Sequence, residues 1–386
     1  MIKCLKCNEV DGIQKAGFNR GRQRFRCRHC DYYFNIPIEE KLTVKANHQT
    51  TIKDLARELG VSPSTISKAL HNHPDISQIT RKAIIDLAQK MDYYPNQLAY
   101  NLVKSKSRTI GIVVPVFFST FFPSIINGAQ EVLSAAGYNL LICQSNEDYN
   151  LEKKNIDTLL ASRVEGLLVS VSRETNNYDH LLNASKRGVE IVMFNRINKD
   201  LGFSTVGVDD YNGALNAVEH LIQQGYKRIA HLAGPQNLQI GKERLRGYKD
   251  ALLRNNLPIL DNLIIPYDLT EEKAKIYSNH LLNMKELPDA LFAINDPTAI
   301  AFLLVAQERG VKIPQEVGVI GFSYDPISAF IPPGLSTVSQ PTHQIGREAA
   351  TILLSRLQGK DSNMEIEHKV LKTELVIRGS TKRSSN

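Results

Sequence analysis

Apolar residues recur at helical spacing in residues 51–71, and this stretch organises the rest of the chain. The first run lies on one helix face and comprises Ile52, Leu55, Ala56 and Leu59. Gly60 can end this helix in the left-handed conformation. Ser62 can cap a second helix that begins at Pro63, because proline at the first helical position sacrifices no hydrogen bond. The pattern therefore predicts two short helices joined by a tight turn.

The outer face of the second helix is short, polar and cationic. It carries Ser64, Thr65, Ser67, Lys68 and His71. A helix with such a face can enter the DNA major groove and contact base edges and phosphates. An ordinary helical hairpin with a solvated face is the alternative interpretation.

Two further helices are predicted after this motif. Residues 78–91 repeat the same apolar spacing and can close a small bundle over the first two helices. Pro95 can start a helix of about two turns, which is too short to bury its own apolar face. That segment needs a partner outside the bundle.

The long remainder of the chain alternates strand-like and helix-like stretches. Helices are expected at 213–224 and 298–309. The strand candidates are 109–114, 138–143, 166–171, 190–194, 228–233, 290–294 and 317–322. Such alternation predicts an α/β fold of parallel sheets covered by helices on both faces. Two lobes around a cleft are expected, with ligands bound beyond the carboxyl ends of the strands.

Charge is distributed unevenly along the 386 residues. Residues 1–110 hold 19 Lys and Arg and 10 Asp and Glu, a net charge of +9, whereas the rest has a net charge of −2. A basic head on a near-neutral body indicates a polyanionic partner, and nucleic acid fits better than membrane because no basic amphipathic helix or lipidation motif is present. No run approaches the roughly 20 apolar residues of a membrane span, and the first residues do not form a signal peptide, so we expect a cytoplasmic protein.

Four of the five cysteines form two CxxC pairs near the start of the chain. Cys4 and Cys7 are separated by 19 residues from Cys27 and Cys30. This spacing predicts a structural zinc site with four thiolate ligands. Two disulfides or another thiophilic metal are the alternatives, and the expected compartment disfavours disulfides.

Arginine alternates with other residues between these cysteine pairs, at Arg20, Arg22, Arg24, Arg26 and Arg28. Strand periodicity would place all five on one face. Residues 3–36 resemble the zinc ribbons at the N-termini of some transposases and their regulators, in which CxxC turns flank a similar basic hairpin. The alternative is that these arginines only keep a small module in solution. Residues 37–49 have no clear periodicity and are interpreted as a linker.

From residue 50 to about 380 the sequence resembles the lactose-repressor (LacI/GalR) family of bacterial transcription factors. The resemblance rests on TIKDLARELGVSPSTISKAL, YYPNQLAYNLVKSKSRTIGIVVP, VGVDDYNGALNAVEHLIQQGYKRIAHLAGP, RLRGY, FAINDPTAI, VGVIGF and PPGLSTVSQP. It implies a two-lobed sensor like the periplasmic sugar-binding proteins, behind an all-α helix-turn-helix domain.

The resemblance also implies roles in DNA binding. Pro63, Ser64 and Lys68 would read bases, and Thr65 and Ser67 would hold phosphates. Leu102, next to Ala99, would insert into the minor groove as a wedge. The free energy lost by unstacking the bases would be offset by the additional contacts that bent DNA makes with the protein. Thr51 and Asn96 complete the predicted DNA-binding set. Lys68 stands where the family often has arginine, and lysine cannot make the same bidentate fork to guanine.

Polar residues at strand ends are the effector-binding candidates by the same resemblance. They are Asn195, Arg196, Arg244, Asn295, Asp296, Ser323 and Gln340. Asn195 and Ser323 stand where aspartates are usual. Phe117, with Phe118, Phe121 and Phe122, could stack on the ring of a sugar, or could pack at a lobe or dimer surface.

No catalytic motif is present: the sequence lacks G-x-S-x-G, H-E-x-x-H, a P-loop and G-x-G-x-x-G. We therefore expect no enzyme, but a homodimeric, DNA-binding transcription repressor controlled by a small carbohydrate effector. Two rival interpretations are a sugar-binding protein without a DNA role and a zinc-ribbon enzyme of transposition. The expected domains are a ribbon (1–36), a linker (37–49), a helix-turn-helix domain (50–92), a hinge (93–108) and a sensor (109–386).

Overall fold

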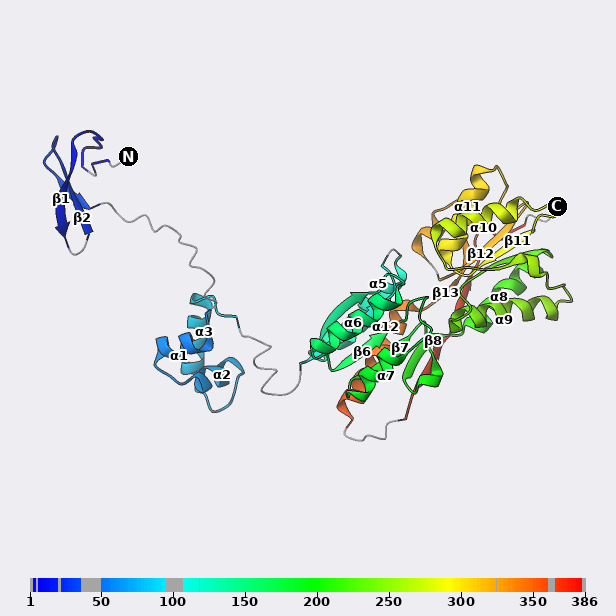
Figure 1. Ribbon diagram of the computed structural model, residues 1–386, viewed down its shortest axis with the longest axis horizontal. Coiled ribbons are helices and arrows are strands. Elements are labelled where there is room, and N and C mark those ends of the chain that lie inside the picture. Colours follow the sequence, from blue (N-terminus) through cyan, green and yellow to red (C-terminus); the bar gives the residue numbers. More distant parts are fainter. Residues whose placement is uncertain are drawn as a thin grey trace. The chain divides into compact units, whose positions relative to one another are not determined.

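A computed structural model of the chain (Figure 1) describes residues 3–4, 6–19, 22–35, 50–94, 107–117, 119–323, 325–359 and 365–383. The chain forms two compact units, Met1–Gln97 and Leu98–Asn386. The first contains a small sheet and a three-helix bundle, and the second contains two large sheets with their helices.

The small sheet consists of three antiparallel strands in the order β1–β2–β3. They are β1 (Ile13–Asn19), β2 (Arg22–Cys27) and β3 (Tyr33–Asn35). Phe25 and Phe34 are buried beside Cys4 and Cys27, and this cluster is the whole apolar core of the sheet among the described residues. A core of this size needs an additional cross-link to be stable.

The three helices after the small sheet lie where the sequence predicted them, although the third ends at Lys90, one residue before the predicted end. They are α1 (Ile52–Leu59), α2 (Pro63–Leu70) and α3 (Gln78–Lys90). Gly60 follows α1 with a φ of 67°, the left-handed conformation expected there. The hydroxyl of Ser62 accepts a hydrogen bond from the Thr65 N–H at 3.1 Å, which caps α2.

Apolar side chains from all three helices form one core. Leu55 of α1, Ile66 of α2 and Ile84 of α3 are each buried to within 1% of full burial. Because each helix has only two to four turns, this shared core rather than intrinsic helix propensity stabilises the bundle. The helix predicted from Pro95 lies outside the described residues, as do 95–106 as a whole.

The second unit consists of two lobes, each built on a six-stranded sheet. The sheet of the first lobe has the order β14–β8–β7–β6–β4–β5, and all its pairs are parallel. Its strands are β4 (Thr109–Val114), β5 (Asn139–Gln144), β6 (Gly166–Val169), β7 (Glu190–Phe194), β8 (Ser204–Val208) and β14 (His368–Leu371).

The sheet of the second lobe has the order β10–β9–β11–β12–β13–β15. Only its edge pair β13–β15 is antiparallel. Its strands are β9 (Ile229–Ala233), β10 (Ile264–Pro266), β11 (Ala290–Ala293), β12 (Gly318–Ser323), β13 (Ser336–Ser339) and β15 (Glu374–Val376).

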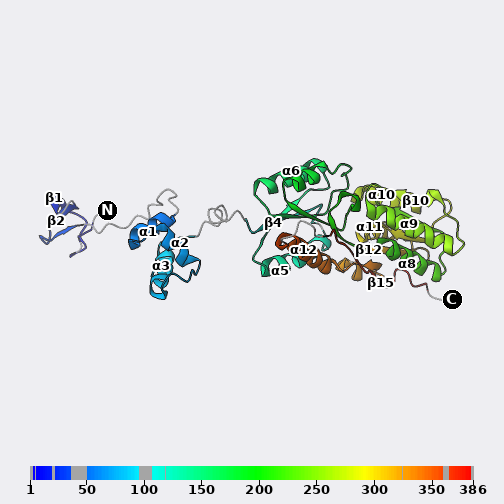
Figure 2. The ribbon, with the colours of Figure 1, turned by 90° about the horizontal axis from the view of Figure 1, so that it is seen from below.

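Helices cover both faces of each sheet. In the first lobe they are α5 (Phe121–Ala135) and α12 (Thr342–Gln358) on one face, with α6 (Tyr149–Ala161) and α7 (Asp179–Lys186) on the other. Figure 2 shows α6 on one side of β4 and α5 with α12 on the other. In the second lobe α8 (Asp210–Gln223) and α9 (Gln239–Arg254) lie opposite α10 (Glu271–Leu282) and α11 (Asp296–Glu308). The expected α/β architecture is confirmed.

The chain passes between the lobes three times. It crosses after β8, returns after β13 to form α12 in the first lobe, and crosses again between β14 and β15. These crossings fix the carboxyl ends of both sheets beside each other, which is where parallel sheets bind ligands.

The sequence located seven strands of the two large sheets, and 109–114 and 190–194 agree with the structure to the residue. It did not predict β8, β10, β13, β14 and β15. Of these, β10, β14 and β15 lie at sheet edges, whereas β8 and β13 are interior strands. None of the helices in the described part of the chain is long and apolar enough to span a membrane.

His231 on β9 is a buried titratable group in the core of the second lobe. Its ring lies between Phe292, with centroids 4.6 Å apart, and Tyr248, at 5.0 Å. Nδ1 lies 2.8 Å from the Phe292 carbonyl oxygen, while Nε2 has no partner among the described residues. Burial lowers the pKa of His231 to about 4.

This burial predicts a specific pH dependence of stability. The unfolded chain takes up a proton at His231 below its ordinary pKa of about 6.5, whereas the folded chain does so only near pH 4. The free energy of unfolding should therefore fall by about 3 kcal/mol between these pH values because of His231. Urea unfolding of His231→Phe should lack this part of the slope, and the exposed control His280→Gln should keep it. Parallel curves for His231→Phe and the parent would contradict the assignment.

Candidate functional site

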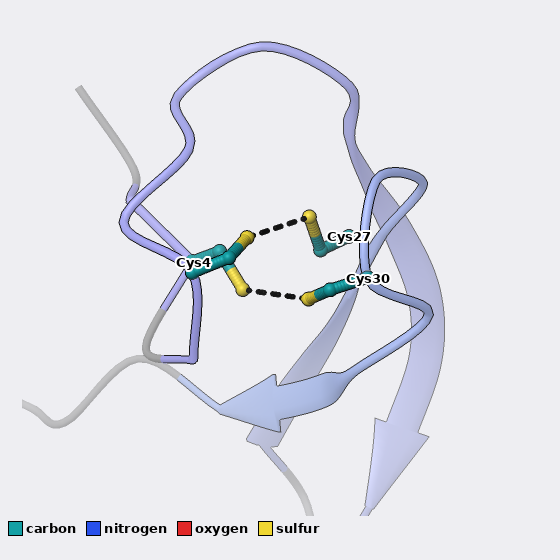
Figure 3. Close-up of side chains that lie close together, drawn as sticks. Cys4, Cys27 and Cys30 are labelled. Atoms are coloured by element: carbon teal, nitrogen blue, oxygen red, sulfur yellow. Dashed lines mark hydrogen bonds between the residues drawn. The ribbon is translucent and has the colours of Figure 1, made fainter.

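Four cysteine sulfur atoms meet at one end of the small sheet. Cys4 Sγ lies 3.5 Å from Cys30 Sγ, and Cys7 Sγ lies 3.7 Å from Cys27 Sγ. All four atoms lie within 4.8 Å of one another. Figure 3 shows the Cys4, Cys27 and Cys30 side chains facing one another across the gap between the two turns. A disulfide needs a sulfur separation of about 2.05 Å, so the cysteines are free thiols.

The two cysteine turns have the same backbone geometry. In each, the N–H of the first cysteine, Cys4 or Cys27, donates to the carbonyl five residues on. The carbonyl of the same cysteine accepts from the N–H four residues on, at Asn8 or Asp31. Asn8 and Asp31 have φ values of 60° and 59°, the left-handed conformation that asparagine and aspartate tolerate best. Each turn thus aims two sulfur atoms at the same point.

The sulfur spacing fits a tetrahedral metal site. Four thiolates at about 2.3 Å from one ion would be about 3.8 Å apart, close to the distances observed here. The pairs also come from two separate turns, so one ion would join the two turns. The four cysteines are therefore close enough to bind a single metal ion.

The arginine-rich strand of the small sheet is partly described. The guanidinium groups of Arg24 and Arg26 lie 4.5 Å and 5.6 Å from the centre of the Tyr33 ring. Arg28 is exposed but lies in the turn after β2. Arg20 and the side chain of Arg22 lie outside the described part, so the single face of five arginines stays a prediction.

The predicted base-reading residues of α2 face outward. Pro63, Ser64 and Lys68 are exposed, as is Thr51 before α1. Lys68 Nζ lies 3.0 Å from the Asp75 carboxylate, and this pairing lowers the pKa of Asp75. Thr65 and Ser67 are half-buried, and the Ser67 carbonyl contacts the His71 ring at 2.8 Å. The predicted hinge contacts Asn96, Ala99 and Leu102 lie outside the described residues.

A cavity of about 760 Å³ is lined by residues of both lobes. Six of the eight predicted effector residues line it: Asn195, Arg196, Arg244, Asn295, Ser323 and Gln340. They come from the carboxyl ends of strands β7, β11, β12 and β13 and from α9. The structure thus brings together residues that are up to 145 positions apart in the sequence.

Arg196 is buried and held by a carboxylate of its own lobe. Its two terminal nitrogens lie 2.6 Å and 2.8 Å from the two oxygens of Glu147, a bidentate pair. Although burial disfavours the charged form of Glu147, the Arg196 guanidinium holds the pKa of Glu147 below its usual range. Arg196 Nε is buried without a partner among the described residues.

Arg244 is neutralised in the same way in the second lobe. Nε and Nη2 lie 2.8 Å and 2.7 Å from Asp210 Oδ1, and Nη1 donates to the Ile294 carbonyl at 2.6 Å. The guanidinium lies 3.6 Å from the centre of the Phe322 ring. Burial raises the pKa of Asp210, and the Arg244 charge opposes that shift. Two of the five N–H groups of Arg244 have no partner among the described residues.

Uncharged polar groups complete the wall of the cavity. Asn195 has a φ of 57°, and its side chain makes no hydrogen bond to a described residue. Gln340 Nε2 lies 3.4 Å from Ser323 Oγ, while Gln340 Oε1 is buried without a described partner. Asn295 Oδ1 accepts from the Thr298 N–H and hydroxyl, at 2.9 Å and 2.6 Å. Both hydrogen-bond donors and acceptors therefore face the cavity.

Phe117 and Asp296 do not line the cavity, unlike the other predicted residues. Phe117 is exposed, and Phe121 and Phe122 line the cavity in its place. The Asp296 carboxylate is buried, and it accepts hydrogen bonds from the Thr337 hydroxyl at 2.5 Å and the Asp325 N–H at 2.8 Å. Burial raises the pKa of Asp296. Asp296 thus holds the second lobe together behind the cavity.

The sequence analysis missed several residues of this site. Glu147 and Arg173 line the cavity, and Asp210 holds Arg244 from behind it. The rule that polar residues follow the carboxyl ends of parallel strands could have identified Glu147 and Arg173, which follow β5 and β6.

Two family models match the chain. Residues 51–96 match bacterial regulatory proteins of the lacI family, and residues 218–381 match the periplasmic binding protein-like domain. The HTH-type transcriptional repressor CytR of Escherichia coli (strain K12) is 33% identical over 338 residues, which is 88% of this chain and 98% of that protein.

Solved structures give the same result. A complex of the transcriptional regulator CelR with cellobiose aligns with 86% of this chain and all of that chain, with a TM-score of 0.65 and 28% identity. A lac repressor dimer bound to operator and the anti-inducer ONPF covers 86% of this chain and 99% of that chain, with a TM-score of 0.76. At 22% identity, this second likeness supports the fold alone.

The buried pair of Arg244 and Asp210 predicts a large effect of single substitution. Arg244→Ala would leave the Asp210 charge buried without its partner and should lower the free energy of unfolding by about 3–5 kcal/mol. Combining Arg244→Ala with Asp210→Asn should recover part of the lost free energy of unfolding, as measured by urea unfolding of the full chain. Arg246→Ala, two residues along α9 with an exposed side chain, is the control and should cost less than about 1 kcal/mol. Equal losses for the two arginine variants would argue against a buried pair.

Proposed function

Because the chain belongs to the LacI family of bacterial regulatory proteins, we propose that it is a dimeric transcription repressor whose operator binding is controlled by an uncharged, sugar-like effector. The observation that carries this proposal is a cavity between two lobes in a chain that also contains a helix-turn-helix domain. We assign residues 50–92 to operator binding, 93–108 to the hinge and 109–386 to the sensor.

Operator binding is supported by the exposed face of α2. Ser64 and Lys68 project from a helix whose opposite side, at Ile66, is fixed in the core. A rigid helix with short polar side chains suits the major groove. Two-fold operators are read by two copies of such a helix, which supports a homodimer. Action on chromosomal DNA supports a cytoplasmic location, and the regulatory relatives support a protein without catalytic activity.

An uncharged effector is supported by the charges in the cavity. Both buried arginines already have carboxylate partners, so neither presents a net charge to a ligand. Asn195, Ser323 and Gln340 offer both donors and acceptors, as hydroxyl groups require. Phe121 and Phe122 add apolar surface for a ring face. The CelR relative was solved with cellobiose, which supports a carbohydrate for this chain too.

Selection of genomic DNA fragments by the purified full-length chain tests this function. The chain should enrich a two-fold site, and Lys68→Ala should weaken binding to it about five- to 150-fold, which is the range for a base contact. Lys82→Ala, an exposed lysine on α3, should change binding little. A panel of neutral sugars should alter occupancy of the selected site by the parent chain. Failure to enrich any site would leave a sugar-binding protein without a DNA role as the better interpretation.

The four clustered cysteines support structural zinc in residues 1–36. Zinc would be held by Cys4, Cys7, Cys27 and Cys30, and it would supply the cross-link that the small core of the sheet lacks. The Lys, Arg, Asp and Glu side chains of residues 1–36 sum to a net charge of +5. We propose that this ribbon binds DNA outside the core half-sites, mainly through phosphates.

Deleting residues 1–40 tests the ribbon proposal. Each phosphate neutralised steepens the dependence of log K on log salt by about 0.9, so the deletion should flatten that slope by several units. The footprint should shorten while the preferred core sequence stays the same. Cys4→Ser with Cys27→Ser should reproduce the deletion, because the ribbon needs its metal to fold. An unchanged slope and footprint would indicate instead that the ribbon binds a protein.

A further inference from the structure

A short loop of the first lobe borders the cavity. It makes hydrogen bonds both within its own lobe and to the second lobe. This loop, residues 171–175, follows β6 at the carboxyl end of the sheet. Arg173, at its centre, lines the cavity and is half-buried. The proposed function assigns no role to this loop.

Two buried carboxylates hold consecutive N–H groups of loop 171–175. The Ser172 N–H donates to Glu152, and the Arg173 N–H donates to Glu147 at 2.8 Å. Glu152 is fully buried and also accepts from the Thr175 hydroxyl at 3.0 Å. The loop is therefore fixed firmly to the first lobe.

The same loop makes hydrogen bonds to the second lobe. Arg173 Nη1 donates to the Asp268 carbonyl at 2.8 Å. In the other direction, Asn237 Nδ2 donates to the Arg173 carbonyl at 2.8 Å and to the Thr175 carbonyl at 3.4 Å. Asp268 and Asn237 follow β10 and β9, so the loop joins the carboxyl ends of both sheets at one rim of the cavity.

A cavity residue holds this loop from inside. Arg196 Nη1 donates to the Val171 carbonyl at 3.2 Å, and its pair with Glu147 fixes the oxygen that accepts the Arg173 N–H. Arg196 makes no hydrogen bond to the second lobe among the described residues. Any ligand that moves Arg196 would therefore change how loop 171–175 meets the second lobe.

We propose that loop 171–175 is a clasp between the lobes, and that Arg196 and Glu147 are positioning residues that make its closure depend on what occupies the cavity. This proposal rests on the proposed function only in treating the cavity as the effector site. The clasp gives the sensor one small contact through which a ligand in the cavity can alter the relation between lobes.

Hydrogen exchange of the full-length chain, followed by mass spectrometry without DNA or effector, tests the clasp. Asn237→Ala and Arg173→Ala should each speed exchange about tenfold in both 171–175 and 267–271, because either substitution opens the same contact. Peptides from α6 and α11 should keep their parent rates. The matched controls are Asn262→Ala and Arg187→Ala, which remove exposed side chains of the same types from the second and first lobes.

The two substitutions combined should speed exchange no more than the faster single variant, as expected of one cooperative contact. Acceleration confined to the segment that carries each substitution would overturn the clasp, since the contacts would then be independent. Acceleration of the same size in the two controls would overturn it as well.

Arg196→Lys tests the link to the cavity. Lysine keeps a positive charge opposite Glu147, which protects the fold, but it cannot hold both carboxylate oxygens and the Val171 carbonyl. Exchange in 267–271 should rise about threefold, although residue 196 does not touch that segment by any described hydrogen bond. An unchanged hydrogen-exchange rate in residues 267–271 would contradict the positioning role of Arg196. None of these measurements involves DNA, so their failure would leave the operator-binding proposal intact.

Discussion

The sensor depends on two buried guanidinium–carboxylate pairs, one in each lobe. An unpaired charge in such a position costs several kcal/mol, so Arg196 and Arg244 can line the cavity only because Glu147 and Asp210 neutralise them. Each pair lies where its sheet ends in the cavity, and each guanidinium keeps N–H groups without described partners. The two pairs therefore place polar N–H groups in the cavity wall without adding net charge, as the proposed hydroxyl-bearing effector requires.

The three parts of the chain meet the same requirement, burial of enough surface to fold, in different ways. The helix-turn-helix bundle shares one small core among three capped helices. The lobes bury large apolar clusters on both faces of parallel sheets. Among its described residues the cysteine-bearing sheet buries two phenylalanines and two cysteines, and its four clustered thiols are close enough to bind a metal ion that would supplement this small core.

Several features could be predicted because they depend on residues close together in the sequence. The turn at Gly60, the cap at Ser62 and the start of α2 at Pro63 follow from local backbone chemistry. The spacing of the CxxC pairs implied one site for four sulfur atoms, and the sulfur distances agree. Continuous apolar runs marked the buried strands, since parallel strands covered on both faces contain few polar residues. Six cavity residues were also found, through the resemblance of their motifs.

Side-chain direction and pairing between distant segments were decided only by the tertiary structure. Asn295 and Asp296 are neighbours in the sequence, yet one lines the cavity and the other turns into the lobe to bind Thr337. The sequence alone determined which residues could form helices, strands and a metal site, because those depend on local spacing. Only the fold decided that Glu147 would meet Arg196, 49 positions away, and that Asn237 would reach loop 171–175, because those contacts depend on how two sheets place their carboxyl ends together.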